Sequence, residues 1–400
     1  MHNAERTARL APTVFTEFTL LAQKSGAVNL GQGFPDFDGP EEVKEAAIEA
    51  IRAGQNQYAA GPGAPSLRRA IADHSLRFYG QSIDPDTMVT VTSGATEALF
   101  DALLALVNPG DEVVLFEPFY DSYLAGIELA GGVAKLVALR PPDALHPNQF
   151  CFDEAELRAA FSAKTKLFLL NTPNNPTGKV FTRSELEQIA ALCEEHDVVA
   201  LSDEVYEHLV YVPAQHVRLA TLPGMAKRTI TVSSAGKTFA LTGWKIGWAI
   251  GPKDLRGAVQ SVHQYVTFAT SSPMQAAVAK ALSLDDKFFA SLRVEYARRR
   301  DLLGAALNAA GLTTQPCDGA YFLLADPSNA RTESGEPFPG DFEFCRYLTE
   351  TIKVAAIPVS AFLSPAGAKA AKPLARFAFC KRDETLLEAS RRLANLVHLR

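Results

Sequence analysis

Short runs of β-branched and other apolar residues alternate with longer helical segments between about residues 89 and 285, and this alternation constrains the fold more than any other feature of the chain. The predicted strands are Val89–Thr92, Val113–Phe116, Val133–Leu139, Lys166–Leu170, Val198–Leu201, Thr229–Val232 and Ile246–Ile250. Helical patterns between them include Ala95–Val107, Tyr120–Ala130 and Arg183–His196. Strands that alternate with helices form βαβ units, whose parallel strands are covered by helices. We therefore expect an α/β fold with a mostly parallel sheet.

The pattern changes after about Asp285. A long amphipathic helix at about Lys287–Ala310 is followed by three strand-like runs and a final helix that begins at Asp383. The three runs are Tyr321–Ala325, Val354–Pro358 and Arg376–Phe379. Because 400 residues exceed what one compact core usually covers, we expect a second, smaller α+β domain.

Charge and cysteine content exclude several classes of protein. The net charge is −6 at pH 7 and no dense run of lysine and arginine is present, so we expect no nucleic-acid binding. The five cysteines are scattered, which predicts reduced thiols and neither a disulfide framework nor a metal site. No apolar stretch approaches the roughly 20 residues of a membrane span, and the N-terminus lacks the pattern of a signal peptide. We therefore expect a cytoplasmic protein that does not bind membranes.

Three segments rich in small residues follow predicted strands. They are Ser93–Thr96, Asn171–Gly178 and Ser233–Lys237, the last of which continues to Gly243–Gly247. Open α/β sheets bind ligands beyond the carboxyl ends of their strands. The three segments are therefore expected to meet at one crevice.

Ser93–Thr96 marks a point where a strand ends and a helix begins. Free main-chain N–H groups and the positive end of a helix dipole favour a phosphate there, although serine and threonine are also ordinary helix caps. The Glu97 carboxylate would repel a phosphate unless it turns away. The contacts are therefore expected from main-chain N–H groups and the Thr96 hydroxyl.

Two lysines lie in small or apolar surroundings. Lys237 follows three small residues, and a lysine in a crowded apolar site loses its proton more easily, as imine chemistry requires. The alternative is a solvated surface lysine. Lys245 lies in a segment with two tryptophans, where a cation needs an anion beside it. That anion would be a phosphate, with Ser234 adding its hydroxyl, or else a carboxylate of the protein.

Asp203 ends an apolar run. A carboxylate in that place needs a cationic partner, for which a protonated pyridine nitrogen is one candidate. The alternative is that Asp203 caps a following helix. Tyr206, three residues after Asp203, is expected one helical turn away on the same side.

Together these segments resemble the fold-type I, class I/II aminotransferases that depend on pyridoxal 5′-phosphate (PLP), over essentially the whole chain. The matching motifs are Asn29–Phe37, Asn56–Tyr58, Glu117–Tyr120, Asn171–Gly178, Ser202–Tyr206, Ser233–Lys237 and Arg376–Phe377. The chain looks most similar to methionine, glutamine/kynurenine and succinyldiaminopimelate aminotransferases. The resemblance implies a three-layer α/β/α large domain at residues 40–285, a small domain formed by residues 1–39 and 286–400, and a homodimer.

The resemblance also implies which residues bind PLP. Lys237 would bind the cofactor covalently and later carry the proton between substrate and cofactor, and Asp203 would keep the pyridine nitrogen protonated. Asn175 and Tyr206 would bond the oxygen at the ring's 3′ position, and Tyr120 would stack on the ring. The phosphate ligands would be Ala95, Thr96, Ser234 and Lys245 of one subunit and Tyr58 of the other.

Substrate binding is implied in the same way. Arg376 would clamp the substrate carboxylate with its two-pronged guanidinium, with Asn175 beside it, and Gly33 would let the main chain approach the substrate. The side-chain pocket would contain Phe15, Phe34 and Tyr120, together with Tyr58 and Phe268 of the neighbouring chain. Such a lining suits methionine, aromatic, glutamine or kynurenine donors, with succinyldiaminopimelate as the alternative.

The implied reaction moves an amino group from an amino acid to a 2-oxo acid in two half-reactions. PLP-dependent β-elimination from a cysteine conjugate is an alternative, because it uses the same carbanion. A PLP-sensing transcription regulator is disfavoured, since the resemblance begins within the first few tens of residues and leaves no room for a DNA-binding domain. A Rossmann dinucleotide site is also disfavoured, because Asp36 stands where the motif that begins at Gly31 needs its third glycine.

Overall fold

A seven-stranded sheet forms the centre of the computed structural model, which describes residues 4–7 and 13–396. Its strands are β2 (Val89–Ser93), β3 (Glu112–Glu117), β4 (Val133–Ala138), β5 (Thr165–Asn171), β6 (Val199–Asp203), β7 (Thr229–Ser234) and β8 (Ile246–Ile250). They lie in the order β2-β8-β7-β6-β5-β3-β4. Only β8 runs against its neighbours; the pairs from β7 to β4 are parallel. The expected mostly parallel sheet is therefore confirmed.

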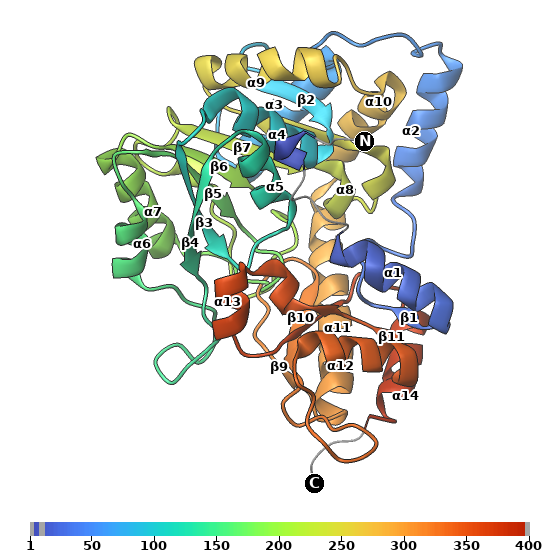
Figure 1. Ribbon diagram of the computed structural model, residues 1–400. Helices are drawn as coiled ribbons and strands as arrows, with labels where there is room; N and C mark the ends of the chain where they lie inside the picture. The colour runs from blue at the N-terminus through green and yellow to red at the C-terminus, as the bar shows by residue number, and fades with distance from the viewer. Residues whose placement is uncertain (1–3, 8–12, 397–400) are drawn as a thin grey trace.

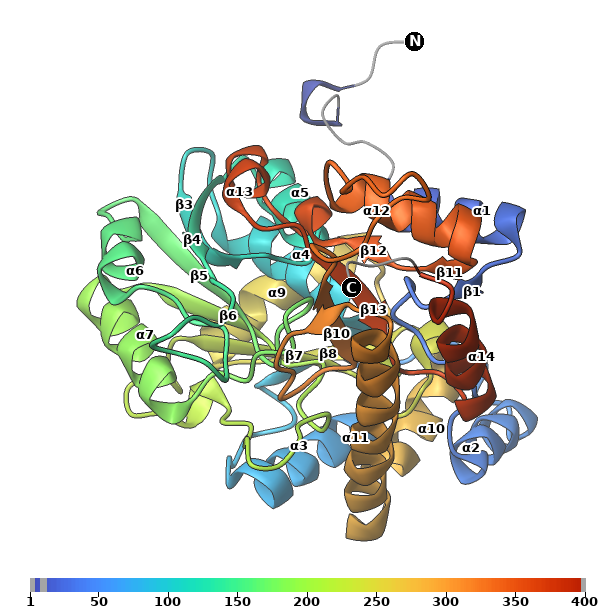
Figure 2. The same ribbon diagram turned by 90° about the horizontal axis from the view of Figure 1, so that it is seen from below.

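Helices cover both faces of this sheet (Figures 1 and 2). One face packs on α4 (Gly94–Leu106), α5 (Ser122–Leu129) and α9 (Lys253–Val266). The other packs on α3 (Pro65–Tyr79), α6 (Glu154–Ala160), α7 (Arg183–Glu195) and α10 (Ser272–Leu282), with α2 (Glu41–Arg52) beside α10. Successive strand residues point to opposite faces: in β3, Val113 and Leu115 join one apolar cluster, and Val114 and Phe116 join the other. The result is the three-layer α/β/α arrangement.

The C-terminal part of the chain forms a smaller antiparallel sheet in the order β12-β13-β10-β9. Its strands are β9 (Thr313–Thr314), β10 (Phe322–Asp326), β12 (Ile357–Pro358) and β13 (Ala375–Ala378). Around it lie α1 (Val14–Ser25), α11 (Asp286–Ala309), α12 (Asp341–Tyr347), α13 (Pro365–Ala370) and α14 (Asp383–Leu393). This is the expected α+β part; the domain boundaries given above stay predictions.

One predicted strand is wrong as a single element. Val354–Pro358 divides at Ala356 into β11 (Val354–Ala355) and β12, which belong to different sheets. β11 pairs in parallel with β1 (Val28–Asn29), whereas β12 pairs with β13. The break arises because the segment meets two pairing partners that are distant in the sequence.

Among the described residues, no helix combines the length and the apolar character that crossing a membrane requires.

Asp101 on α4 is an unusual member of the buried core. Its side chain is fully buried, and neither carboxylate oxygen has a hydrogen-bond partner within the described part of the chain. Burial raises the pKa of Asp101 to about 7, the nearby Glu97 carboxylate adds to the rise, and His263 opposes it. A buried carboxylate without hydrogen bonds costs stability once it is ionised.

Asp101→Asn is expected to gain stability relative to the wild type as the pH rises from about 4 to 8. Unfolded aspartate loses its proton around pH 4, whereas folded Asp101 keeps its proton to about pH 7. Between these values the folded wild-type protein binds more protons than the unfolded chain, so its stability falls as the pH rises. The difference in free energy of unfolding should shift by about 4 kcal/mol in favour of the variant, because about three pKa units correspond to that free energy. Denaturant unfolding at several pH values measures it, and a difference that is independent of pH would contradict the raised pKa.

Candidate active site

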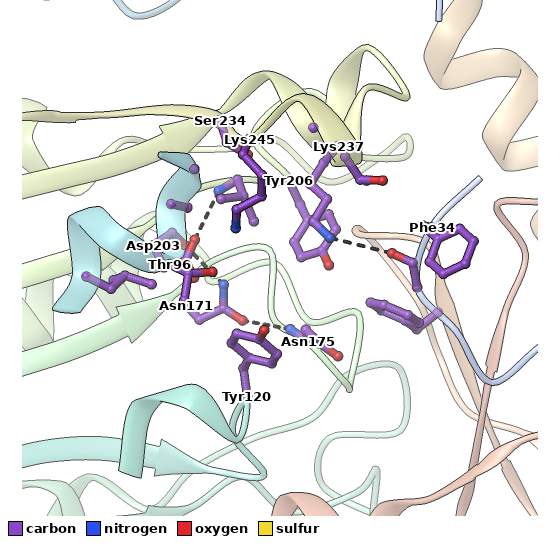
Figure 3. A pocket seen from close by; sticks show the side chains of 18 of the residues that line it. Phe34, Thr96, Tyr120, Asn171, Asn175, Asp203, Tyr206, Ser234, Lys237 and Lys245 are labelled. Carbon is purple, nitrogen blue, oxygen red and sulfur yellow. Dashed lines mark hydrogen bonds between the residues drawn. The ribbon is translucent and has the colours of Figure 1, made fainter. Parts of the chain in front are cut away.

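A cavity of about 310 Å³ lies at the carboxyl ends of β5, β6 and β7, where Asn171, Asp203 and Ser234 end their strands (Figure 3). The N-terminus of α4 borders the same cavity. Its opposite wall comes from the smaller sheet and the N-terminal segment, through Phe322 of β10, Arg376 of β13 and residues 32–34. The three loops predicted to converge therefore do so, between the two sheets.

Lys237 lies on α8 (Ala235–Thr238), the single turn of helix that follows β7. Its Nζ lies 3.5 Å from the carbonyl oxygen of Gly33 and 5.7 Å from the ring centroids of Tyr206 and Tyr321. Burial lowers the pKa of Lys237 to about 8, although the Cys380 thiol and the Asp203 carboxylate oppose this shift. The amine is therefore far easier to deprotonate than an ordinary lysine, and the surface-lysine alternative is wrong.

Asp203 is buried at the end of β6 with few partners. The Tyr123 hydroxyl donates to its Oδ2 at 2.6 Å, and the Val205 N–H donates to its Oδ1 at 3.3 Å. Burial raises the pKa of Asp203 to about 6, and these two hydrogen bonds oppose the rise. The chain turns after Asp203 without forming a helix, so Asp203 is not the helix cap considered above, and Tyr206 reaches the cavity from this turn.

The N-terminus of α4 forms a subsite rich in hydrogen-bond donors. No side chain caps its first turn. Glu97 turns away, because one of its carboxylate oxygens accepts a bond from the main-chain N–H of Ser93 and the other lies 2.9 Å from Nδ1 of His263. The exposed Lys245 and the buried Ser234 line the same subsite, and within residues 13–396 neither the ammonium nor the hydroxyl has a hydrogen-bond partner. Donors without acceptors around a helix N-terminus suit an anion.

Gly94 allows Lys245 to approach this subsite closely. Its φ of 77° lies in the left-handed region that favours glycine. A Cβ atom at this position would lie 3.0 Å from Nζ of Lys245. A larger residue would therefore displace the cation from the helix N-terminus.

Arg376 is a buried cation with neutral partners only. Its Nη1 donates to Oδ1 of Asn175 at 2.8 Å and its Nη2 to the carbonyl oxygen of Gly31 at 2.7 Å. Three aromatic rings surround the guanidinium, at 4.1 Å from Phe322, 4.8 Å from Phe362 and 5.1 Å from Phe15. Burial lowers the pKa of Arg376 to about 10. No carboxylate forms a salt bridge with it in the described part of the chain, so a carboxylate ligand is the partner that this charge lacks.

Gly33 gives the opposite wall its shape. Its carbonyl oxygen accepts a bond of 2.6 Å from the Tyr321 hydroxyl, on the side where Lys237 lies. A Cβ atom on Gly33 would lie 2.7 Å from the Phe322 ring. The main chain therefore passes as close to the cavity as a residue without a side chain allows.

All of the predicted site residues line the cavity except Tyr58 and Phe268, which are predicted to reach it from a second subunit. Those brought together are Phe15, Gly33, Phe34, Ala95, Thr96, Tyr120, Asn175, Asp203, Tyr206, Ser234, Lys237, Lys245 and Arg376. Tyr58 does not belong to the lining; it is 82% exposed and packs edge-on against Phe268, with 5.3 Å between ring centroids. The roles of these residues toward a ligand stay predictions.

Two residues that shape the site, Tyr123 and Phe322, are not among those predicted from the sequence. Tyr123, which donates to Asp203, falls within the predicted helix Tyr120–Ala130, and its spacing of three from Tyr120 was the available signal. Phe322, which stacks on Arg376 and lines the cavity, belongs to a predicted strand in which no residue spacing distinguishes it.

Comparison with known proteins agrees with this geometry. The sequence model of the family described as aminotransferase class I and II matches residues 25–393. The chain is 47% identical to a probable N-succinyldiaminopimelate aminotransferase of Mycobacterium tuberculosis over 392 residues, which cover 96% of each chain. The solved structure of N-succinyldiaminopimelate aminotransferase from Mycobacterium tuberculosis, 47% identical in sequence, superimposes with a TM-score of 0.92 over 98% of this chain and 99% of that one.

Two further relatives have other names. The chain is 44% identical to kynurenine–oxoglutarate transaminase 3 of Mus musculus over 401 residues, which cover 96% of this chain and 88% of the mouse protein. It is 41% identical to the methionine aminotransferase of Escherichia coli over 389 residues, which cover 97% of each. The three relatives thus share one reaction and differ in the substrate that their names give.

Proposed function

The chain belongs to the class I and II aminotransferases, and we propose that it binds PLP in this cavity with Lys237 as the reactive lysine. The observation that carries the proposal is the half-buried Lys237 amine, which lines the cavity and whose pKa is lowered to about 8. An amine that deprotonates near neutral pH is the nucleophile that a cofactor aldehyde requires.

The chemistry of the cavity fits PLP. Asp203 offers a buried carboxylate to a pyridine nitrogen, and the N-terminus of α4 offers donors without acceptors to a phosphate. Lys237 lies in the same cavity. The Ala95 and Thr96 N–H groups, the Ser234 hydroxyl and Lys245 would hold the phosphate, and Asn175 and Tyr206 would hold the ring hydroxyl.

The protein's own groups then divide the work. When bound, PLP supplies an electron sink for the electrons of the substrate Cα–H bond. Arg376 and Asn175 bind the substrate carboxylate and so fix the orientation of the Cα–H bond. The neutral Lys237 amine would take the proton from the substrate Cα and would later return it. The Asp203 carboxylate would hold the pyridine nitrogen and keep a proton on it.

The pocket favours an uncharged donor side chain. Phe15, Phe34, Tyr120 and Phe322 provide an apolar lining. The described residues that line the cavity include three cations, Lys237, Lys245 and Arg376, and each already has a role. We therefore place methionine, aromatic, glutamine and kynurenine donors first. N-succinyldiaminopimelate, named for the Mycobacterium tuberculosis relative, is the alternative.

A homodimer completes the proposed site. Tyr58 and Phe268 are exposed aromatic residues that pack on each other outside their own cavity. Exposed aromatic groups of this kind are typical of protein interfaces. Tyr58 would reach the phosphate in the cavity of the second subunit, and Phe268 would border its side-chain pocket.

The absorption spectrum of the PLP-loaded protein tests the function and ranks the donors. Methionine, glutamine, kynurenine or phenylalanine, added singly, should convert the band of the PLP form to that of pyridoxamine phosphate. Aspartate should react at least about tenfold more slowly, because its second carboxylate meets an apolar lining. No PLP band after soaking with PLP would sink the cofactor proposal, and equal turnover of aspartate would contradict only the apolar pocket. N-succinyldiaminopimelate as the fastest donor would establish the alternative.

Tyr123→Phe is expected to weaken PLP binding by about tenfold, because it removes a hydrogen bond to an ionised carboxylate. The bond from the Tyr123 hydroxyl is the shorter of the two hydrogen bonds that Asp203 accepts. Without it, Asp203 holds its negative charge less well beside the pyridine nitrogen. Fluorescence titration of the apoprotein with PLP measures the dissociation constant. An unchanged constant would mean that the Val205 N–H alone suffices.

A further inference from the structure

His263 of α9 is fully buried, and both of its ring nitrogens are engaged. Nδ1 lies 2.9 Å from Oε1 of Glu97, and Nε2 lies 3.0 Å from the carbonyl oxygen of Gly61. A carbonyl oxygen only accepts, so Nε2 carries a proton. The ring therefore joins two segments that are distant in the sequence, one at the start of α4 and one in the loop before α3.

Glu97 and His263 form a buried, directly bonded pair, which is an ion pair when the imidazole is protonated. The charge and hydrogen bond of Glu97 raise the pKa of His263 despite its burial. Asp101 lies 3.9 Å from the same Nδ1 and adds a second carboxyl group to this side of the ring. Because the pair is buried and its ring nitrogens are held on both sides, the imidazole has a fixed orientation.

One end of this connection leads to the cavity of its own subunit. The second carboxylate oxygen of Glu97 accepts a hydrogen bond from the N–H of Ser93, the residue immediately before α4. The first-turn N–H groups of α4 form the proposed phosphate subsite. The position of Glu97 therefore sets the position of that turn.

The other end leads to the loop that carries Tyr58. Gly61 accepts the bond from Nε2, and the same loop is fastened to α10 by a bond of 2.5 Å from the Ser272 hydroxyl to the carbonyl oxygen of Gln57. Phe268, which packs on Tyr58, donates its N–H to the carbonyl oxygen of His263 at 2.9 Å. His263 is therefore bonded through its ring to the loop that carries Tyr58 and through its carbonyl oxygen to Phe268.

We infer that His263 is a positioning residue that connects the phosphate subsite of its own subunit with the Tyr58 that serves the cavity of the partner subunit. The inference rests on the proposed sharing of Tyr58 in a dimer. It assigns the two ring nitrogens to two different active sites, Nδ1 to the site in its own chain and Nε2 to the site across the interface.

Two substitutions separate these tasks. In His263→Asn the amide nitrogen takes the place of Nδ1, so the contact with Glu97 is kept and the bond to Gly61 is lost. In His263→Gln the longer side chain places its nitrogen where Nε2 was, so the bond to Gly61 is kept and the contact with Glu97 is lost. The variants are similar in chemistry and are matched controls for each other.

Hybrid dimers show which cavity each substitution affects. One subunit carries Lys237→Ala, so borohydride fixes PLP covalently only in the subunit that retains Lys237, and the amount fixed reports PLP binding there. His263→Asn in the Lys237→Ala subunit should raise the PLP dissociation constant of the intact cavity by about tenfold, and in the intact subunit by less than about twofold. His263→Gln should give the reverse pattern.

Tyr58→Phe in the Lys237→Ala subunit tests the premise separately. If Tyr58→Phe raised the PLP dissociation constant of the cavity that retains Lys237 by about tenfold and His263→Asn left it unchanged, the role of His263 would be overturned. The sharing of Tyr58 between subunits would still stand. No effect of Tyr58→Phe would overturn the shared site, and the inference with it. Equal effects of both His263 variants in both placements would mean that the residue only supports folding. Ser272→Ala loosens the Tyr58 loop and leaves the pair of Glu97 and His263 in place. It should weaken PLP binding only in the partner's cavity, and it keeps the test available if His263→Asn does not fold.

Discussion

Lys237→Ala is expected to lower the rate of multiple-turnover transamination by at least about 1,000-fold, because it removes both a nucleophile and a proton carrier. The amine is half-buried, has a pKa of about 8, and shares the cavity with Asp203 and Arg376. Among the described residues that line the cavity, the other lysine is Lys245, which belongs to the donor-rich subsite at α4 and is not placed to replace Lys237. Steady-state assays with a keto-acid acceptor measure the loss.

The control for this variant is Lys245→Ala, which retains the reactive amine. It should weaken PLP binding and recover much of its rate at saturating PLP, whereas Lys237→Ala should stay inactive at any PLP concentration. Borohydride reduction followed by peptide mass analysis should place the cofactor on the peptide that contains Lys237 in the wild type and in Lys245→Ala. Sustained turnover by Lys237→Ala would refute the role assigned to the lysine.

The central sheet could be predicted from the sequence because its strands are buried on both faces. Val113–Phe116 is a continuous apolar run in which every residue packs against a helix layer, and such runs are recognisable without knowledge of their neighbours. Val354–Pro358 is equally apolar, but its fold depends on β1 and β13, which supply separate pairing partners. The local sequence pattern therefore predicts the apolar segment, whereas its division into β11 and β12 depends on the tertiary structure.

The site divides in the same way. Lys237, Asp203 and Ser234 were predictable because each stands at the carboxyl end of a strand or just beyond it, and such ends meet at one edge of a sheet. Tyr123 and His263 were not, because their partners Asp203, Glu97 and Gly61 come together only once the order of the strands and the packing of α9 on α4 are known. Residues that hold other residues carry little sequence signal of their own.

Arg376→Leu is expected to reduce kcat/KM for amino-acid donors by about 100- to 1,000-fold while leaving the fold as stable as before or more so. Truncating one partner of a buried, hydrogen-bonded charge pair costs about 2–5 kcal/mol. Here the guanidinium is removed, and the substrate carboxylate is the charge left unpaired. In the ligand-free protein the guanidinium is a buried charge with only neutral partners, and an apolar side chain fits among Phe15, Phe322 and Phe362. Replacing a buried charge by a well-packed apolar group is often neutral or stabilising.

Arg376→Lys is the matched control, since it keeps the charge but loses the two-pronged geometry. It should lie between the wild type and Arg376→Leu in kcat/KM, with most of the change in KM, because the carboxylate is bound equally in the ground state and the transition state. Thermal unfolding of all three ligand-free proteins completes the test. If Arg376→Leu lost stability in proportion to activity, the bonds to Asn175 and Gly31 would be the reason for the arginine, and the carboxylate clamp would have to be sought elsewhere in the cavity. If Arg376→Leu were stable and lost much of its kcat/KM, the unpaired buried charge of Arg376 would instead serve to bind the substrate carboxylate.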